Sequence, residues 1–111
     1  MNNDNTFPFR LAAHAALAWF AAALGTAAMA APTVDQARQW SAACANCHGP
    51  AGKAPAGSPV PGLAGRPQSY LVEQMQAFKA GTRDATVMQQ IAKGYTDEQI
   101  TAIAAWFASV K

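Results

Sequence analysis

The sequence predicts an all-α domain, and three observations support this prediction. Apolar residues recur at helical spacing in several segments of the second half of the chain. Threonine or proline precedes most of these segments and glycine follows most of them, as is typical of helix ends. No segment alternates apolar and polar residues in the manner of a half-buried strand. We therefore expect the domain to be helical throughout.

The first thirty residues predict a secretory signal rather than part of the domain. Residues 11–24 are almost wholly apolar, Arg10 precedes them, and small residues up to Ala30 follow. We expect cleavage after Ala30, which divides the chain into a signal peptide at 1–30 and a domain at 31–111. An uncleaved membrane anchor is the alternative, although the apolar run is shorter than the roughly 20 residues that span a bilayer.

Size and charge limit what the remaining 81 residues (111 minus 30) can do. A domain of this size is close to the lower limit for a self-sufficient core, so an apolar group bound at its centre would add stability. Seven Lys and Arg residues against five Asp and Glu residues leave a net charge of +2, with no basic run. We therefore expect no nucleic-acid partner and no stable membrane insertion after signal cleavage.

The first helix of the domain is expected to begin at Thr33, whose hydroxyl suits an N-cap, with Asp35 in its first turn. This helix should run through Trp40 and directly into Cys44. Trp40 lies four residues before Cys44, so the two side chains share one helix face. We expect Trp40 to be a structural residue of the core.

Cys44-Ala45-Asn46-Cys47-His48 is the attachment pattern for a c-type haem. The two cysteines add to the haem vinyl groups as thioethers, and the two intervening residues let both sulfurs reach one macrocycle. The histidine then lies under the iron as its proximal ligand. Two other interpretations lack support, because a thiol–disulfide oxidoreductase needs a βαβ setting and a zinc site needs more ligands than this motif supplies.

Residues 49–67 contain five glycines and five prolines, a density that excludes regular helix or strand. A loop of this length in a compact domain is usually functional, and we expect it to lie ordered against one haem face. Low-complexity disorder is the alternative. The apolar residues Val60 and Leu63 argue against that alternative.

The loop is followed by a predicted helix that begins near Pro67, because proline suits the first turn of a helix. Gly81 is expected to end this helix. Leu71, Met75 and Phe78 fall on one of its faces, which should point inward.

Two shorter segments complete the expected fold after a polar link. Residues 88–93 predict a brief helix that Gly94 stops. Thr96 should cap the terminal helix, with Gln99 at the reciprocal position of a capping box. The buried stripe of this helix is expected to contain Ile100, Ile103, Ala104 and Phe107.

Few residues are available as the second axial ligand of the iron. His48 is the only histidine after the predicted signal, since His14 lies within it. Met75 sits in the middle of an apolar helical stripe, where methionine is usually core filler. Met88 follows a link that can carry it over the opposite haem face. We expect Met88 to be the ligand, with Met75 as the alternative.

Over nearly all of residues 31–111 the sequence resembles the small class I c-type cytochromes. It is most similar to the branch that contains dihaem cytochrome domains and the cytochrome subunit of flavocytochrome c sulfide dehydrogenase. The resemblance implies the class I fold, with four to five short helices around one covalent haem. The matching segments are Cys44-Ala45-Asn46-Cys47-His48-Gly49, Pro61-Gly62-Leu63-Ala64-Gly65, Tyr70-Leu71 with Gln74 and Phe78, Met88, and the closing helix from Asp97 to Phe107.

For the haem iron, the resemblance implies Cys44 and Cys47 as the thioether sites and His48 and Met88 as the axial ligands. The carbonyl oxygen of Pro61 is then the acceptor for the ring N–H of His48. A hydrogen bond of this kind fixes the orientation of the imidazole and raises its basicity.

The resemblance also implies roles for residues of the haem pocket and of the helix packing. Leu63 and Tyr70 match haem-pocket positions, and Trp40 and Trp106 match aromatic positions where the first and last helices cross. The single Cys-x-x-Cys-His motif implies one haem, whereas dihaem relatives repeat it. The chain has no flavin fingerprint, so a flavoprotein role would need a separate subunit.

Filled axial positions on both faces of the iron favour electron transfer over substrate chemistry. We expect a periplasmic one-electron carrier or the electron-accepting subunit of a dehydrogenase, without catalytic residues of its own. Its partners are expected to be redox proteins, such as a flavoprotein dehydrogenase or a terminal oxidase. A haem-based gas sensor or a peroxidase-like protein with a labile Met88 is the alternative.

Overall fold

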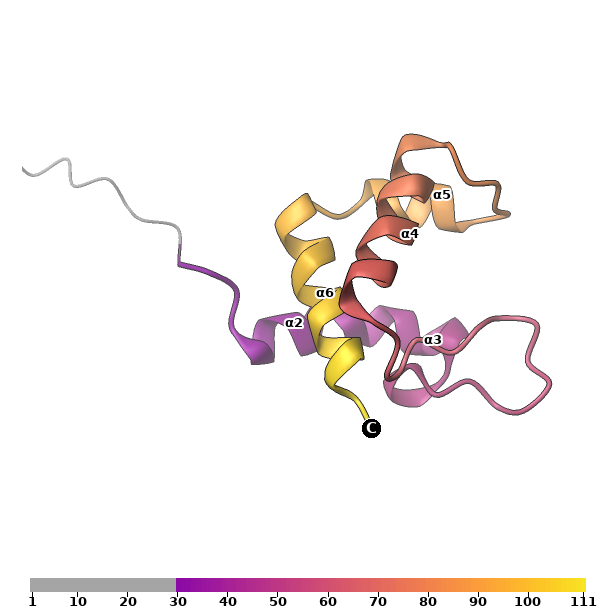
Figure 1. Cartoon of the computed structure of the whole chain (residues 1–111), viewed down its shortest axis with the longest axis horizontal. Coiled ribbons are helices and arrows are strands. Elements are labelled where there is room, and N and C mark those ends of the chain that lie inside the picture. The colour runs from indigo at the N-terminus through magenta and orange to yellow at the C-terminus, as the bar shows by residue number, and fades with distance from the viewer. Residues whose placement is uncertain (1–29) are drawn as a thin grey trace, which may run out of the picture. The chain divides into compact units, whose positions relative to one another are not determined.

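The computed structural model describes residues 30–111, so the predicted signal peptide lies almost wholly outside the described residues and stays a prediction. This part of the chain is helical and contains no strand, which confirms the all-α prediction. None of its helices has the length and apolar character needed to cross a membrane. The α-helices, shown in Figure 1, are α2 (Val34–Ser41), α3 (Ala45–His48), α4 (Gln68–Ala80), α5 (Met88–Lys93) and α6 (Asp97–Ser109).

Helix α2 is capped by Thr33 as predicted, with a full capping box. The backbone N–H of Gln36 donates to Thr33 Oγ1, and the Gln36 side chain accepts from the Thr33 N–H, both at 3.2 Å. The helix does not run straight into the cysteines, because a 3₁₀ turn at Ala42–Cys44 separates α2 from α3. Buried Ser41 donates from its hydroxyl to the Ala37 carbonyl at 2.7 Å, a contact that is known to bend helices.

The segment between α3 and α4 is a loop as predicted, with one short 3₁₀ turn at Pro50–Gly52. The two arms of the loop are joined at Gly52, whose carbonyl accepts from the Leu63 N–H at 2.7 Å and the Ala64 N–H at 3.1 Å. The end of the loop is fixed to α6, because the Gly65 N–H donates to the Phe107 carbonyl at 2.9 Å. The loop is thereby closed on itself at Gly52 and fixed to α6 at Gly65.

Helix α4 begins one residue later than expected, since Pro67 has extended ψ and stands at the N-cap instead of inside the helix. Gly81 ends α4 in the left-handed conformation that glycine adopts without strain, with φ of 76°. Helix α5 covers Met88 to Lys93 and stops at Gly94, as the sequence predicts.

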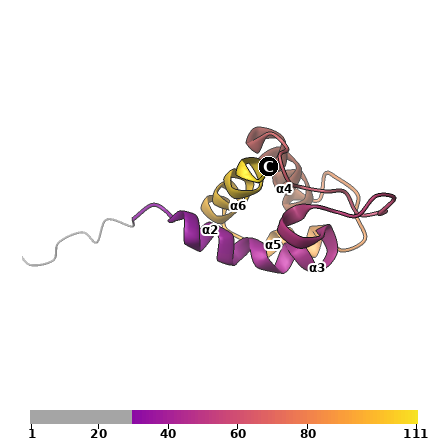
Figure 2. The same cartoon turned by 90° about the horizontal axis from the view of Figure 1, so that it is seen from below.

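Helix α6 lies at the centre of the packing, in contact with both α2 and α4 (Figure 2). Its capping box joins Thr96 and Gln99, as predicted. All four residues of its predicted stripe are buried, and three of them form the core cluster with Leu71 of α4. The side chains of Trp40 and Trp106 pack against this cluster. The described residues thus have the all-α packing that the resemblance implies.

Candidate functional site

A cavity of about 960 Å³ lies between the cysteine motif, the loop, α4 and α5. This volume is near the upper end of the usual range for small-molecule sites, and most lining residues are apolar. The cavity brings together every site residue that the sequence predicted, although these residues come from four separate segments. They are Cys44, Cys47, His48, Pro61, Leu63, Tyr70 and Met88.

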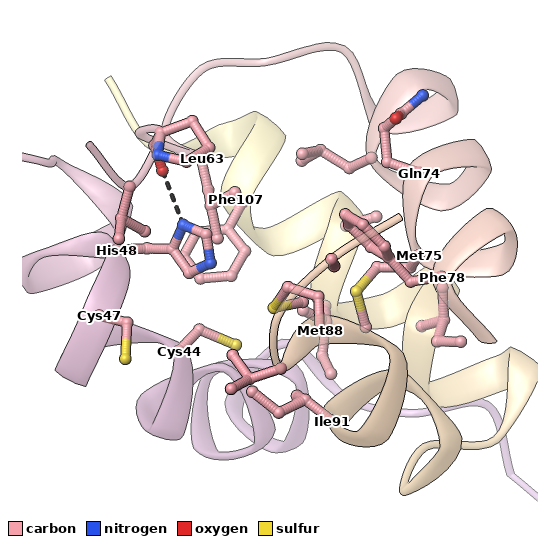
Figure 3. Close-up of a pocket in the computed structure, with 18 of the residues that line it drawn as sticks. Cys44, Cys47, His48, Leu63, Gln74, Met75, Phe78, Met88, Ile91 and Phe107 are labelled. Atoms are coloured by element: carbon pink, nitrogen blue, oxygen red, sulfur yellow. Dashed lines mark hydrogen bonds between the residues drawn. The ribbon is translucent and has the colours of Figure 1, made fainter. Parts of the chain in front are cut away.

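The two cysteines lie on the wall of the cavity that α3 and the preceding 3₁₀ turn form (Figure 3). Cys44 is half-buried and Cys47 is exposed, and neither takes part in a disulfide. Burial raises the pKa of the Cys44 thiol, and the neighbouring Cys47 adds to this effect. A thiol–disulfide oxidoreductase needs a thiolate with a lowered pKa, so this environment argues against that chemistry.

His48, at the end of α3, is buried, and its ring is held by one hydrogen bond. Its Nδ1 lies 2.7 Å from the carbonyl oxygen of Pro61 (Figure 3). Because a carbonyl only accepts, Nδ1 carries the proton in this contact, and Nε2 is left with a free lone pair for a metal. The second ring nitrogen lies on the cavity side of the imidazole in Figure 3.

Two methionine side chains line the part of the cavity opposite His48. Met88 is the first residue of α5, and Met75 lies in the middle of α4 (Figure 3). Both are partly buried. The sequence predicted Met75 as core filler, whereas the structure places it in the cavity wall. The apolar face of α4 points into this cavity as well as toward α6, and periodicity alone does not separate the two environments.

Leu63 and Tyr70 both line the cavity but differ in their exposure to solvent. Leu63 packs against the core cluster, whereas Tyr70 is 39% exposed and forms part of the rim. The guanidinium carbon of Arg66 lies 5.7 Å from the centroid of the Tyr70 ring. Within residues 30–111, Arg66 and Arg83 are the only Lys, Arg, Asp or Glu residues that line the cavity. Sequence reasoning missed both arginines, because nothing in the sequence distinguishes them from ordinary surface charges.

The residues of the cavity fit a haem better than a bare metal ion. No group of three or more His, Cys, Asp or Glu side chains in residues 30–111 is arranged to hold a metal. The cavity instead offers two thiols on one wall, one oriented imidazole and thioether sulfurs on the other side, within a largely apolar lining. A large apolar macrocycle with an iron centre matches this donor set, since imidazole and thioether are the axial ligands of many haem irons.

Comparison with known sequences gives a match over most of the described chain. The sequence model of the cytochrome c family matches residues 33–111. The chain is 37% identical over 71 residues to a thiosulfate dehydrogenase electron acceptor from Thiomonas intermedia, covering 64% of this chain and 33% of that protein. It is 40% identical over 70 residues to the cytochrome subunit of sulfide dehydrogenase from Chlorobaculum tepidum, covering 63% and 62%.

A solved structure agrees with the sequence matches. The cytochrome c4 of Acidithiobacillus ferrooxidans superposes with a TM-score of 0.60 at 35% identity, over 67% of this chain and 49% of the other. The chain thus spans between one third and just under two thirds of the length of these relatives. The similarity therefore concerns one domain of proteins that are longer.

Proposed function

The chain belongs to the cytochrome c family, and we propose that it transfers single electrons through one haem c with His48 and Met88 as axial ligands. Cytochromes of this family carry electrons and attach haem covalently, and the chain is a class I member with an all-α fold. The cofactor sites in this proposal are Cys44 and Cys47 for the thioethers, with Pro61, Leu63 and Tyr70 around the macrocycle.

The observation that carries the proposal is the contact between His48 Nδ1 and the Pro61 carbonyl at 2.7 Å, inside a cavity that both cysteines also line. A single histidine whose Nδ1–H is occupied presents Nε2 in a fixed direction, which is what a proximal ligand requires. Covalent attachment at Cys44 and Cys47 would keep the macrocycle against this nitrogen.

The position of Met88 supports its proposed role as the second axial ligand. It lies across the cavity from His48, so protein groups flank the site on both sides. A bound haem supplies the one-electron change between ferric and ferrous iron. A thioether ligand would favour the ferrous form and raise the reduction potential, and the apolar lining would limit the access of water to a bound haem. No catalytic residue is needed for this task.

The partners of the protein are proposed to be redox proteins. Two relatives are named as the electron acceptor of thiosulfate dehydrogenase and the cytochrome subunit of sulfide dehydrogenase. We propose the same kind of partner here, a dehydrogenase that delivers electrons from an inorganic sulfur compound. A soluble carrier that meets its partner transiently and a permanent subunit are both compatible with a single haem domain.

Residues 1–30 are proposed to direct the chain to the periplasm and to be removed there. Haem attachment to a Cys-x-x-Cys-His motif and an apolar leader with small residues before Ala31 support this location. Amino-terminal sequencing of the haem-containing protein should find Ala31 as the first residue. A protein that begins at Met1 and stays with the membrane fraction would show that the leader is an anchor.

Substitution of the two methionines tests the ligand assignment. In the haem-containing ferric protein, Met88→Ala should abolish the sulfur-to-iron absorption band and open the site to carbon monoxide after reduction. Met75→Ala should retain the band, since α4 would keep its other cavity residues. Loss of the band in Met75→Ala alone would transfer the role to Met75. Rapid carbon monoxide binding by the unmodified ferrous protein would favour a gas sensor or a peroxidase-like protein.

A further inference from the structure

Helix α5, which begins at Met88, packs against α4 but is short and buries few of its own side chains. It is six residues long, and a helix this short is marginal without outside support. Its only fully buried residue is Ala92, whereas Val87 and Ile91 are 54% and 41% exposed. No side chain of the described residues caps its N-terminus. The position of Met88 therefore depends on contacts made by the segments on either side.

Arg83, in the link before α5, is attached to α4 in three ways. Its backbone N–H donates to the Ala77 carbonyl at 3.3 Å. Its guanidinium group donates to Gln74 Oε1 and lies over the ring of Phe78, with 4.5 Å between the guanidinium carbon and the ring centroid. A planar guanidinium group can donate hydrogen bonds at its edge while its face stacks on a ring.

The same residue is attached to α5. The Arg83 carbonyl accepts from Nε2 of Gln89 at 3.0 Å, and Gln89 directly follows Met88. Arg83 thus connects α4 with the first turn of α5, using its side chain toward one helix and its carbonyl toward the other. Val87, at the N-cap, also accepts from the backbone N–H groups of Gln90 at 3.0 Å and Ile91 at 3.1 Å. Within the described chain, the Arg83 carbonyl is the other hydrogen-bond acceptor that the link offers to α5.

The far end of α5 is attached to α4 as well. Lys79 donates from Nζ to the carbonyl of Tyr95 at 2.8 Å and to Asp97 Oδ1 at 2.7 Å. Tyr95 follows α5 by two residues, so this contact fixes the chain just after the helix. The hydrogen bonds of Lys79 lie at the C-terminal end of α5, however, whereas Arg83 is bonded to Gln89, the residue that follows Met88.

From these contacts we infer that Arg83 is a positioning residue for the distal thioether, which limits how often Met88 leaves the iron. This inference rests on the proposed function, in which Met88 is an axial ligand. A thioether favours ferrous iron, so its bond to ferric iron is the weaker one and opens more readily. Contacts that hold the link to α4 oppose this opening, and they keep external ligands out of the ferric site.

The magnitude follows from the contacts that a substitution removes. Arg83→Gln removes the stacking on Phe78 and the charge-assisted hydrogen bond to Gln74, both at the surface. Contacts of these kinds contribute modestly when they are exposed. We expect the rate at which Met88 dissociates to rise about three- to tenfold. Arg83→Lys should give an intermediate rate, because it keeps the positive charge but not the planar group.

Imidazole binding to the haem-containing ferric protein measures this rate, since at saturating imidazole the observed rate is limited by Met88 dissociation. Lys93→Gln is the matched control, as it removes one positive charge from α5 and the Lys93 side chain has no hydrogen bond or ion pair within residues 30–111. Gln89→Ala is a second variant that cuts the connection from the α5 side and leaves Arg83 in place. Its limiting rate should rise in the same direction.

The outcomes separate the inference from the proposed function. Limiting rates of Arg83→Gln and Gln89→Ala that equal those of the unmodified protein and of Lys93→Gln would overturn the role of Arg83 and leave the ligand assignment intact. If Arg83→Gln does not acquire haem, Gln89→Ala decides the question alone. Absence of the sulfur-to-iron band in the unmodified ferric protein would instead refute Met88 as ligand.

Discussion

His48 Nδ1 and the carbonyl oxygen of Pro61 lie 2.7 Å apart, although thirteen residues separate them in the chain. The loop that carries Pro61 is held at Gly52, whose carbonyl accepts from the Leu63 and Ala64 N–H groups. The orientation of the imidazole therefore depends on the path of the loop main chain. No side chain other than His48 itself takes part in the contact.

Substitution of Pro61 by alanine should leave the orientation of His48 unchanged. Alanine keeps the carbonyl that accepts from His48, and the loop is held by the backbone of its neighbours. The free energy of unfolding should fall by up to about 1 kcal/mol, because alanine gives the unfolded chain more freedom than proline does. The reduction potential and the absorption spectrum of the haem-containing variant check this. A large shift in potential would mean that the proline ring itself orients the loop.

Gly52→Ala should destabilise the domain far more than a glycine substitution at an open position. A Cβ at Gly52 would lie 2.7 Å from the ring of Phe107, and the residue has φ of 76°. The strain and the displaced ring together should cost about 2–4 kcal/mol in the free energy of unfolding.

Gly57→Ala is the control for this substitution. Gly57 has nearly the same φ, 77°, but a Cβ there would have no atom of residues 30–111 within 4 Å beyond its own chain neighbours. Only the strain of the left-handed backbone conformation remains, so the free energy of unfolding should fall by about 1–2 kcal/mol. Guanidinium unfolding of the haem-containing variants gives both values. Equal costs at the two positions would show that the Phe107 ring moves aside without penalty.

Ala51→Gly should stabilise the protein. Ala51 has φ of 52° and ψ of 26°, in the left-handed region that costs an L-residue about 1–2 kcal/mol. Glycine removes this strain but loses more conformational freedom on folding, so a net gain of about 0.5–1 kcal/mol is expected. Ala105→Gly, at an exposed position of α6, is the opposite control and should cost about 1 kcal/mol. A loss of stability in Ala51→Gly would contradict the strain argument.

The features of the fold that are set by residues close together in the sequence were predictable. The Thr96–Gln99 box, the stop of α4 at Gly81 and the limits of α5 all follow from chemistry within a few residues, and the structure confirms them. The break after Ser41 was not predictable. It accompanies a hydroxyl bond to the Ala37 carbonyl that competes with a continuous helix, and no residue type there excludes helix.

The candidate site was likewise only partly predictable from the sequence. The Cys-x-x-Cys-His spacing predicted the residues of the cavity wall that carries the two thiols. The resemblance predicted the contact between His48 and Pro61, which the structure contains. The ligand roles themselves stay predictions. Met75 was assigned to the core, because an apolar stripe has the same period whether it faces a helix or a cavity. Arg83 gave no signal, since its partners on α4 and α5 become visible only in three dimensions.

The ion pair between Lys79 and Asp97 should make stability depend on pH in the acid range. The hydrogen bond from Lys79 lowers the pKa of Asp97 below its ordinary value of 3.8, with a further contribution from Gln76. A carboxyl whose pKa is lower in the folded state stabilises that state above the unfolded pKa. This stabilisation is lost as the pH falls through the folded-state pKa, which lies below 3.8.

Asp97→Asn should therefore lower the unfolding temperature at pH 6, and the difference from the unmodified protein should shrink as the pH falls below 3.8. Glu98→Gln is the matched control, because its carboxylate lies on the same first turn of α6 and its pKa is lowered chiefly by a backbone hydrogen bond. Both carboxylates are exposed, so both effects are small, but added salt should weaken only the effect at Asp97 strongly. Thermal unfolding of the haem-containing variants between pH 3 and pH 6 at two salt concentrations measures this. A difference at Asp97 that persists unchanged into acid would locate its contribution in packing instead of charge.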